Sequence, residues 1–300
     1  MGTLLNRRRY MGGGSPQPID YGYFRIIPTA NSTVTLSMGA NAPVTQMAYS
    51  VDNGVTWNSY TKSSSALNIS VNATAGVPIL WRGNGTKMAS GSNNGQYSYF
   101  SCGQPFDIEG DLNSLIFGNN YIENQNYAAY SFPMLFRSSK VRYAHNCIIH
   151  CDVAGANCFD SMFGNSTLET PPVIKINTIG SASCVYMFSG CASLLYCPQM
   201  NITKLQSRCF ANMFATCTSI TEGMDLPALT LVDSCYSGMY KNCSNLAKIK
   251  MLATSIDANG CLNNWVSGVA AEGTFIKNRN ATWTTTGANG VPTGWTIEYE

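Results

Sequence analysis

The sequence predicts an α+β protein in which an N-terminal arm and a small β-sandwich precede a repeat solenoid that ends in a capping strand. The strongest observation is a block of Cys, Met-Phe, Cys and Leu that returns every 25 or 26 residues in the second half of the chain. The second is an alternation of apolar and polar side chains in the first half, which is typical of half-buried strands. The third is a start rich in arginine and glycine. The chain is therefore divided into an arm (1–19), a β-sandwich (20–106), a solenoid (107–275) and a C-terminal cap (276–300).

The arm carries Arg7, Arg8 and Arg9, followed by Tyr10 and a glycine run. No apolar stretch of about 7 to 15 residues follows the arginines, so we do not expect a secretory signal. Three charges would add only modestly to nucleic-acid binding. Two interpretations stay open: the arm docks against an acidic protein surface, or it is a solvated tail.

The β-sandwich is predicted from short alternating runs, the first of which contains Val34, Leu36 and Met38. Asp52-Asn53-Gly54 separates two later runs as a hairpin turn, and Asn84-Gly85 follows an apolar run in the same way. Several short strands in a segment of this length favour a small immunoglobulin-like sandwich.

The solenoid is predicted because four classes of position keep one phase. Met-Phe pairs or their equivalents recur at 162, 187, 213, 239 and 265, and leucine or isoleucine at 168, 194, 220 and 246. Cys209, Met213 and Phe214 have the spacing of one face of a short helix, and each leucine then begins a short strand. A degenerate unit, Leu135-Phe136, precedes the clear ones. One unit cannot bury its apolar face alone, whereas stacked neighbours can.

The cysteines follow the same phase. Eight of the 12 occupy repeat positions, which indicates buried thiols in a repeated core slot and not disulfides: 158, 184, 191, 209, 217, 235, 243 and 261. After the last repeat, Trp295, Ile297 and Tyr299 alternate as a final strand that we expect to cap the solenoid.

The overall charge excludes some functions. Charged residues make up 11% of the chain and the formal net charge is +2, so no chain-wide field would recruit nucleic acid. No apolar run is long enough to cross a membrane.

The chain contains candidate residues for both metal binding and catalysis. His145, Cys147, His150 and Cys151, with Cys158 nearby, are possible zinc ligands, but their spacing fits no usual zinc pattern and a degenerate repeat explains them better. Asp107, Glu109 and Asp111 could serve a glycosidase, although a loop between domains is the preferred interpretation. We therefore predict no metal, no cofactor and no enzymatic activity.

A leucine-rich solenoid offers its strand side as an extended binding surface. The candidate ligand-binding residues on that side are Glu169, Tyr196, Gln199, Glu222, Lys248 and Lys250.

The repeat block, seen as Asn212–Ile220 followed by Asp225–Leu231, resembles the Bacteroides-surface-protein-A-like (BspA-like) leucine-rich repeats of gut Bacteroidales and their phages. Tyr49–Trp57 and Gly290–Thr296 are similar to the segments that flank such arrays. Ser166 and Trp265-Val266 depart from the block at its two ends, as terminal units commonly do.

Within the arm, Leu4–Gly14 resembles the starts of structural proteins of crAss-like and related gut phages. The resemblance implies a virion protein, a head or tail fibre or decoration subunit, that is anchored by Arg7–Tyr10 to other virion proteins. It further implies a homo-oligomer, with a trimer as the fibre-like case, and a glycan or protein ligand on the host or gut surface. The alternatives are a bacterial surface adhesin of the same repeat family and a polysaccharide-degrading enzyme.

Overall fold

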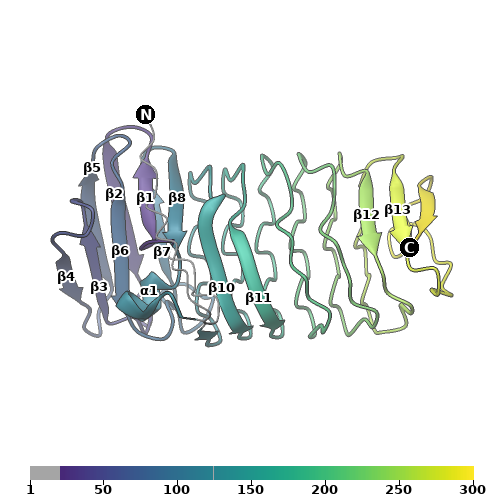
Figure 1. Ribbon diagram of the computed structural model, residues 1–300, viewed down its shortest axis with the longest axis horizontal. Coiled ribbons are helices and arrows are strands. Elements are labelled where there is room, and N and C mark those ends of the chain that lie inside the picture. Colours follow the sequence, from purple (N-terminus) through teal and green to yellow (C-terminus); the bar gives the residue numbers. More distant parts are fainter. Residues whose placement is uncertain (1–20, 124) are drawn as a thin grey trace, which may run out of the picture.

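The computed structural model describes residues 21–123 and 125–300. The structure is mostly β with about 3% helix, and a β-solenoid of about seven turns occupies residues 126–299. Two N-terminal sheets form one end, and the coils of the solenoid stack from them along the long axis of the molecule (Figure 1). The arm, with Arg7, Arg8, Arg9 and Tyr10, lies outside the described residues.

Residues 21–111 contain eight strands in two sheets. They are β1 (Arg25–Pro28), β2 (Ser32–Met38), β3 (Gln46–Ser50), β4 (Asn58–Thr61), β5 (Leu67–Ala73), β6 (Ile79–Asn84), β7 (Ser98–Cys102) and β8 (Phe106–Asp111). Within the described chain, one sheet has the order β5-β2-β7 and the other begins β4-β3-β6-β1-β8. Val34, Leu36 and Met38 all point into the core, as the alternation predicts. The short helices α1 (Ser114–Phe117) and η1 (Gly118–Asn120) follow β8.

The strand order is not that of an immunoglobulin domain, so that part of the prediction is not confirmed. In an immunoglobulin fold the last strand lies beside the strand that precedes it in the chain. Here β7 instead pairs with β2 in the smaller sheet, and β1 takes the place beside β6. The two sheets nevertheless enclose a shared apolar core.

The predicted hairpin at Asp52-Asn53-Gly54 is confirmed, and it joins β3 to β4. The Asp52 carboxylate accepts bonds from the Thr56 hydroxyl (2.6 Å), the Thr56 amide (2.9 Å) and the Ser50 hydroxyl (2.7 Å). These bonds lower the pKa of Asp52 to about 2, the Thr56 hydroxyl bond being the largest cause. The second predicted hairpin, at Asn84-Gly85, is wrong because β6 and β7 lie in different sheets.

The larger sheet runs without a break into the solenoid. β8 pairs with β1 on one side and, in parallel, with β10 (Asn146–Ala154) on the other. Asp107, Glu109 and Asp111 therefore lie in a strand, and their predicted place in a loop is wrong. The remaining strands are β9 (Asn126–Tyr127), β11 (Val173–Ile179), β12 (Lys248–Met251), β13 (Thr274–Lys277) and β14 (Thr296–Tyr299).

The segment that contains each Met-Phe pair, here called the turn side, is a chain of turns and not a helix. In the coil at 157–166, Asn157, Ser161 and Asn165 each have positive φ. Alternate amides bond three residues back, as Met162 does to Phe159 (3.1 Å). The amides between them bond the next coil, as Phe163 does to Met187 (2.8 Å).

The predicted helix, and with it the α+β class, is wrong for a physical reason. A left-handed residue every fourth position gives a repeat of four residues, which sequence spacing does not separate from the 3.6 residues of a helical turn. The apolar face therefore reads alike in both structures.

A column of stacked aromatic rings runs through the core of the coils. Phe163 and Phe188 stack at 5.4 Å between ring centroids, and Phe188 and Phe214 at 5.5 Å. The column is continuous from the N-terminal sheets to the last coils through Phe100, Phe136, Phe163, Phe188, Phe214, Tyr240 and Trp265. The degenerate first unit at Phe136 is thus confirmed as a coil of the stack.

The cysteines are free thiols, and all except Cys102 are buried. The Cys191, Cys217 and Cys243 thiols each donate to the carbonyl of an aromatic residue in the preceding coil, at 3.0–3.1 Å. Burial is the main cause that raises the pKa of Cys191 to about 11 and that of Cys243 to about 12. These thiols fill core positions, as the phase predicts.

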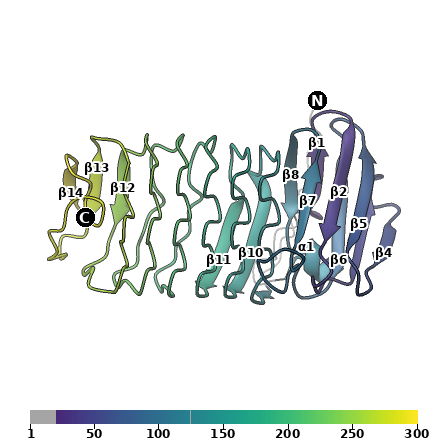
Figure 2. The same ribbon diagram turned by 180° about the vertical axis from the view of Figure 1, so that it is seen from behind.

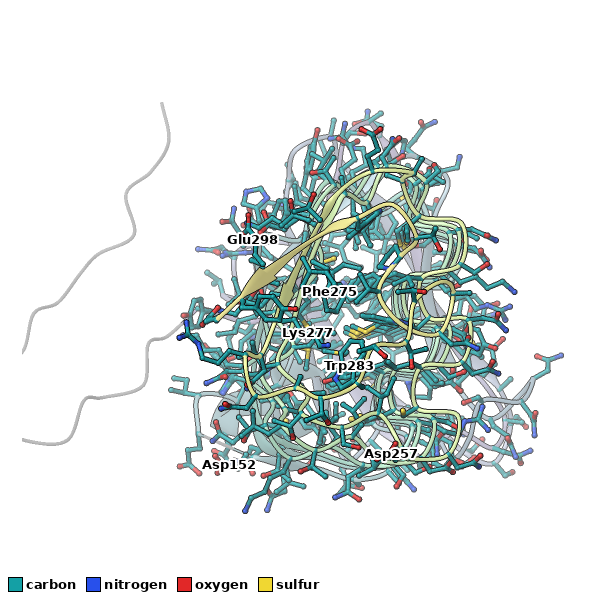
Figure 3. The ribbon with its side chains drawn as sticks, turned by 90° about the vertical axis from the view of Figure 1, so that its right-hand side faces the viewer. Asp152, Asp257, Phe275, Lys277, Trp283 and Glu298 are labelled. Carbon is teal, nitrogen blue, oxygen red and sulfur yellow. The ribbon has the colours of Figure 1, made fainter. Side chains whose placement is uncertain are left out.

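The last coil ends in a strand, as predicted, but the predicted alternation is wrong, because Ile297 and Tyr299 are both exposed and only Trp295, just before the strand, is buried. β14 pairs in parallel with β13 and lies beyond it in the stack (Figure 2). Seen along the axis, Phe275, Lys277 and Trp283 lie inside the outline of the coil, while Glu298 lies at its edge (Figure 3). The Lys277 ammonium donates to the Trp283 carbonyl and lies 4.1 Å from the centroid of the Trp283 ring. Burial lowers the pKa of Lys277.

Candidate functional site

The strand side of the solenoid, formed by β10, β11 and the equivalent segments of later coils, is interrupted in its middle. β10 pairs with β11, and β12 with β13, but residues 196–203 carry no strand or bridge within the described chain. Pro198 has no amide hydrogen, and the Ile202 amide is used locally on the Met200 carbonyl (3.0 Å). Two of the donors that a regular ladder would need are therefore missing.

A groove of about 980 Å³ lies over this interruption. A smaller hollow of about 310 Å³ adjoins it and shares Ile174 and Gln199 with it. We call the two together the strand-face groove. The polar residues that line it are His145, Lys175, Asn177, Tyr196, Gln199, Asn201, Glu222, Asp225 and Lys250.

Hydrogen bonds and ion pairs fix several of these side chains. The Gln199 side-chain oxygen accepts from the Asp225 amide at 2.9 Å and so bridges two coils where no backbone bond does. Lys248 is bonded to Glu222 at 2.7 Å, which raises the pKa of Lys248. Lys250 bonds Glu300 at 2.6 Å, and its pKa is raised by that bond.

The resulting surface has several amide groups and charges that are paired, apart from Lys175, whose ammonium donates to the Tyr21 hydroxyl at 3.4 Å. Asn177 donates to Asp152 at 2.9 Å, which orients its amide. Such a surface can offer hydrogen-bond donors and acceptors to a polar, uncharged ligand. The lining carboxylates Glu222 and Asp225 are both near lysines, at 2.7 Å from Lys248 and 4.0 Å from Lys250 respectively.

The structure brings most of the predicted binding residues together. Tyr196, Gln199, Glu222 and Lys250 line the strand-face groove, and Lys248 touches it through Glu222. Glu169 lies outside the groove lining, where its hydrogen bond raises the pKa of Tyr143. Four of the six candidates therefore line one surface.

Five polar lining residues were not predicted as binding residues: His145, Lys175, Asn177, Asn201 and Asp225. Lys175 and Asn177 alternate with buried Ile174 and Ile176 on β11. This period-two pattern was a usable signal for outward-facing polar residues.

The possible zinc ligands do not converge. His145 is exposed and contacts the Thr170 hydroxyl at 3.1 Å, whereas Cys147 and Cys151 are buried in the core. His150 instead bonds Asp111 at 2.8 Å. In residues 21–123 and 125–300, no group of three or more His, Cys, Asp or Glu is placed to hold a metal ion.

The three carboxylates of β8 are each paired. Asp107 bonds Arg142 at 3.4 Å, Glu109 bonds Arg25 at 3.2 Å, and Asp111 is buried against His150. A glycosidase needs two carboxyl groups that face a substrate, and one of them must be protonated to act as the acid.

The fold and the groove define a β-solenoid protein with a polar groove on its strand side. No protein-family model, no curated protein and no solved structure matches the chain. Over the part of the chain that the structure describes, no helix is both long and apolar enough to cross a membrane.

Proposed function

We propose that the protein is a structural protein of a phage virion, a head or tail fibre or decoration subunit, whose strand-face groove attaches to ligands on the host or gut surface. The groove is the observation that carries the adhesion part. It is a groove lined by both polar and apolar side chains, and some of them are held by bonds such as the one from the Asp225 amide to the Gln199 side chain. Pre-ordered side chains lose less entropy when a ligand binds.

The proposal includes the finer fold. The coils are BspA-like leucine-rich repeats, and the N-terminal sheets are an immunoglobulin-like sandwich with a rearranged strand order. The leucine or isoleucine at 168, 194, 220 and 246 supports the repeat family, since each of these four side chains is fully buried. The Tyr49–Trp57 hairpin supports the flanking domain.

The arm supplies the attachment in this proposal. Arg7, Arg8, Arg9 and Tyr10 bind other virion proteins, and the subunit forms a homo-oligomer, with a trimer as the fibre-like arrangement. Neither nucleic acid nor a membrane is a partner, and no cofactor takes part. The near balance of charge, 18 basic against 16 acidic residues, supports the first exclusion.

Mass spectrometry of purified virions tests the location. We expect the full-length protein in particles and expect deletion of residues 1–14 to abolish its incorporation. Absence of the full-length protein from particles would overturn the virion assignment and favour the bacterial adhesin. Incorporation of the truncated protein would overturn only the anchoring role of the arm.

Binding of the purified protein to host cells tests the groove. Asn201→Ala and Lys175→Ala remove two lining side chains, and we expect each to weaken cell binding by about tenfold, because each would lose a bond to the ligand. Lys204→Ala is the matched control, since Lys204 is exposed on the same coil outside the groove. Equal binding by all three variants would contradict the assignment of the groove.

A further inference from the structure

A second hollow, in the N-terminal sheets, is separate from the strand-face groove. It has a volume of about 610 Å³ and lies between the faces of β3, β4 and β6 and the segment 117–120. This size is within the range of about 300 to 1,000 Å³ that small-molecule sites occupy. We call it the β3-β6 pocket.

Two glycines allow its wall to approach the sheet. A Cβ on Gly83 would lie 2.1 Å from the Leu115 carbonyl oxygen, and a Cβ on Gly118 would lie 2.8 Å from the Gly83 oxygen. Gly118 also has a φ of +54°, which other residues rarely adopt. The wall that carries Asn119 is therefore held close against β6.

Arg82 is the central group of the pocket. Its guanidinium lies 3.9 Å from the Trp57 ring centroid and donates to the Asn119 side-chain oxygen at 2.9 Å. A guanidinium has five N–H donors, so most of them stay available to a ligand. The Tyr23 hydroxyl donates to the same Asn119 oxygen at 3.0 Å, which turns the amide NH₂ of Asn119 away from that contact.

The other polar groups of the pocket are neutral. Asn84 donates to the Gln46 oxygen at 3.3 Å across β6 and β3, and this bond orients both amides. Such an amide pair presents a donor and an acceptor side by side, which suits neighbouring hydroxyl groups. Tyr60 and Phe117, which are both half-buried, add apolar surface, against which the C–H face of a sugar ring can pack.

The charge of the lining selects the ligand. Among the described residues that line the pocket, Arg82 is the only one that is charged at neutral pH, and none is acidic. A guanidinium fork matches a carboxylate in two parallel bonds. We infer that the β3-β6 pocket binds an acidic sugar, with Arg82 on its carboxylate and the Gln46–Asn84 pair on its hydroxyls.

Calorimetric titration of the full chain with methyl glucuronide and methyl glucoside tests this inference, because the two probes differ only at C6, which is a carboxylate in the first and a hydroxymethyl group in the second. We expect the glucuronide to bind about tenfold more tightly, because its carboxylate can accept two parallel charge-assisted hydrogen bonds from Arg82. Arg82→Met should reduce glucuronide affinity to the level of the glucoside. Asn84→Ala should lower the affinity for both probes by the same factor.

Arg279→Met is the matched control, since Arg279 is an exposed arginine outside the pocket. Arg82→Lys keeps the positive charge but lacks the paired donors of the guanidinium, so we expect an intermediate affinity for the glucuronide. This variant replaces Arg82→Met in the test if Arg82→Met does not fold. Equal affinity for both probes, no binding of either at about 10 mM, or unchanged affinity in both Arg82 variants would overturn the inference. Because Arg82 lies outside the strand-face groove, the effect of the Arg82 variants is independent of the proposed virion function.

Discussion

The turn side and the strand side of the solenoid are made by the same coils but are bonded differently. On the turn side, five backbone bonds join each coil to the next from Tyr130 to Asn242. On the strand side the ladder stops after β11 and resumes only near Glu222 and β12. The comparison shows that one regular side is enough to hold the stack, which leaves the other side able to form a groove.

The largest effect is expected in the aromatic column behind the turn side. Phe188→Ala removes a fully buried ring that contacts Phe163 and Phe214, and should cost about 3–5 kcal/mol of unfolding free energy. Denaturant unfolding measures this. Leu195→Ala, at a residue 55% exposed, is the control and should change stability by less than about 0.5 kcal/mol. Equal stability of the two variants would show that the column does not hold the coils.

Alkaline pH should loosen the turn side next. Burial raises the pKa of Cys209 and Cys235 to about 12, whereas an unfolded thiol ionises near about 8.5. Between these values the folded state binds more protons than the unfolded state, so unfolding free energy falls as pH rises. The contribution is fully present below about pH 8.5 and is lost towards about pH 12.

Melting temperatures from pH 8 upward measure this slope. Cys209→Ala lacks one such thiol and should show a shallower decline than the unchanged chain. Buried Tyr236 and Tyr240 act in the same sense, because burial raises their pKa as well. A melting temperature that stays constant to strongly alkaline pH would contradict buried, protonated thiols.

A smaller effect is expected on the strand side at Gln199. Gln199→Ala removes the acceptor of the Asp225 amide and should cost about 1 kcal/mol, the usual net value of one hydrogen bond. Gln206→Ala, at an exposed glutamine of the same coil, should change stability by less than about 0.5 kcal/mol. If both variants are equally stable, Gln199 does not bridge the interrupted ladder.

The smallest effect is expected at the Glu222–Lys248 pair. Glu222→Gln removes an exposed ion pair, and exposed pairs contribute little to stability. The difference in melting temperature from the unchanged chain should be small at low salt and should vanish at about 1 M salt, where charges are screened. A difference that persists in high salt would mean that Glu222 acts through packing.

The sequence contained the period, the phase of the buried residues and the nature of the cysteine positions. These follow from repetition, since Leu168 and Leu246 occupy the same slot in different coils and are equally buried. The conformation between the slots could not be predicted. Asn157, Ser161 and Asn165 accept positive φ in this fold, but these residue types are also common in helices and loops.

Part of the strand-face groove could also be predicted from the repetition of the sequence. Gln199, Glu222 and Lys250 could be assigned to the strand side from their phase alone. The groove could not, because it depends on Pro198 and on a local bond at Ile202 that breaks the ladder. The β3-β6 pocket was missed entirely, since Arg82 and Asn119 are brought together only by tertiary packing.

The aromatic column makes the length of this protein adjustable in whole coils. Excision of one period between Phe163 and Phe214 would place equivalent rings face to face again, with the same thiol and leucine slots beside them. Insertion of a period would do the same. Recombination between the repeats of the gene could therefore change the length of the solenoid while the packing of its core stays the same.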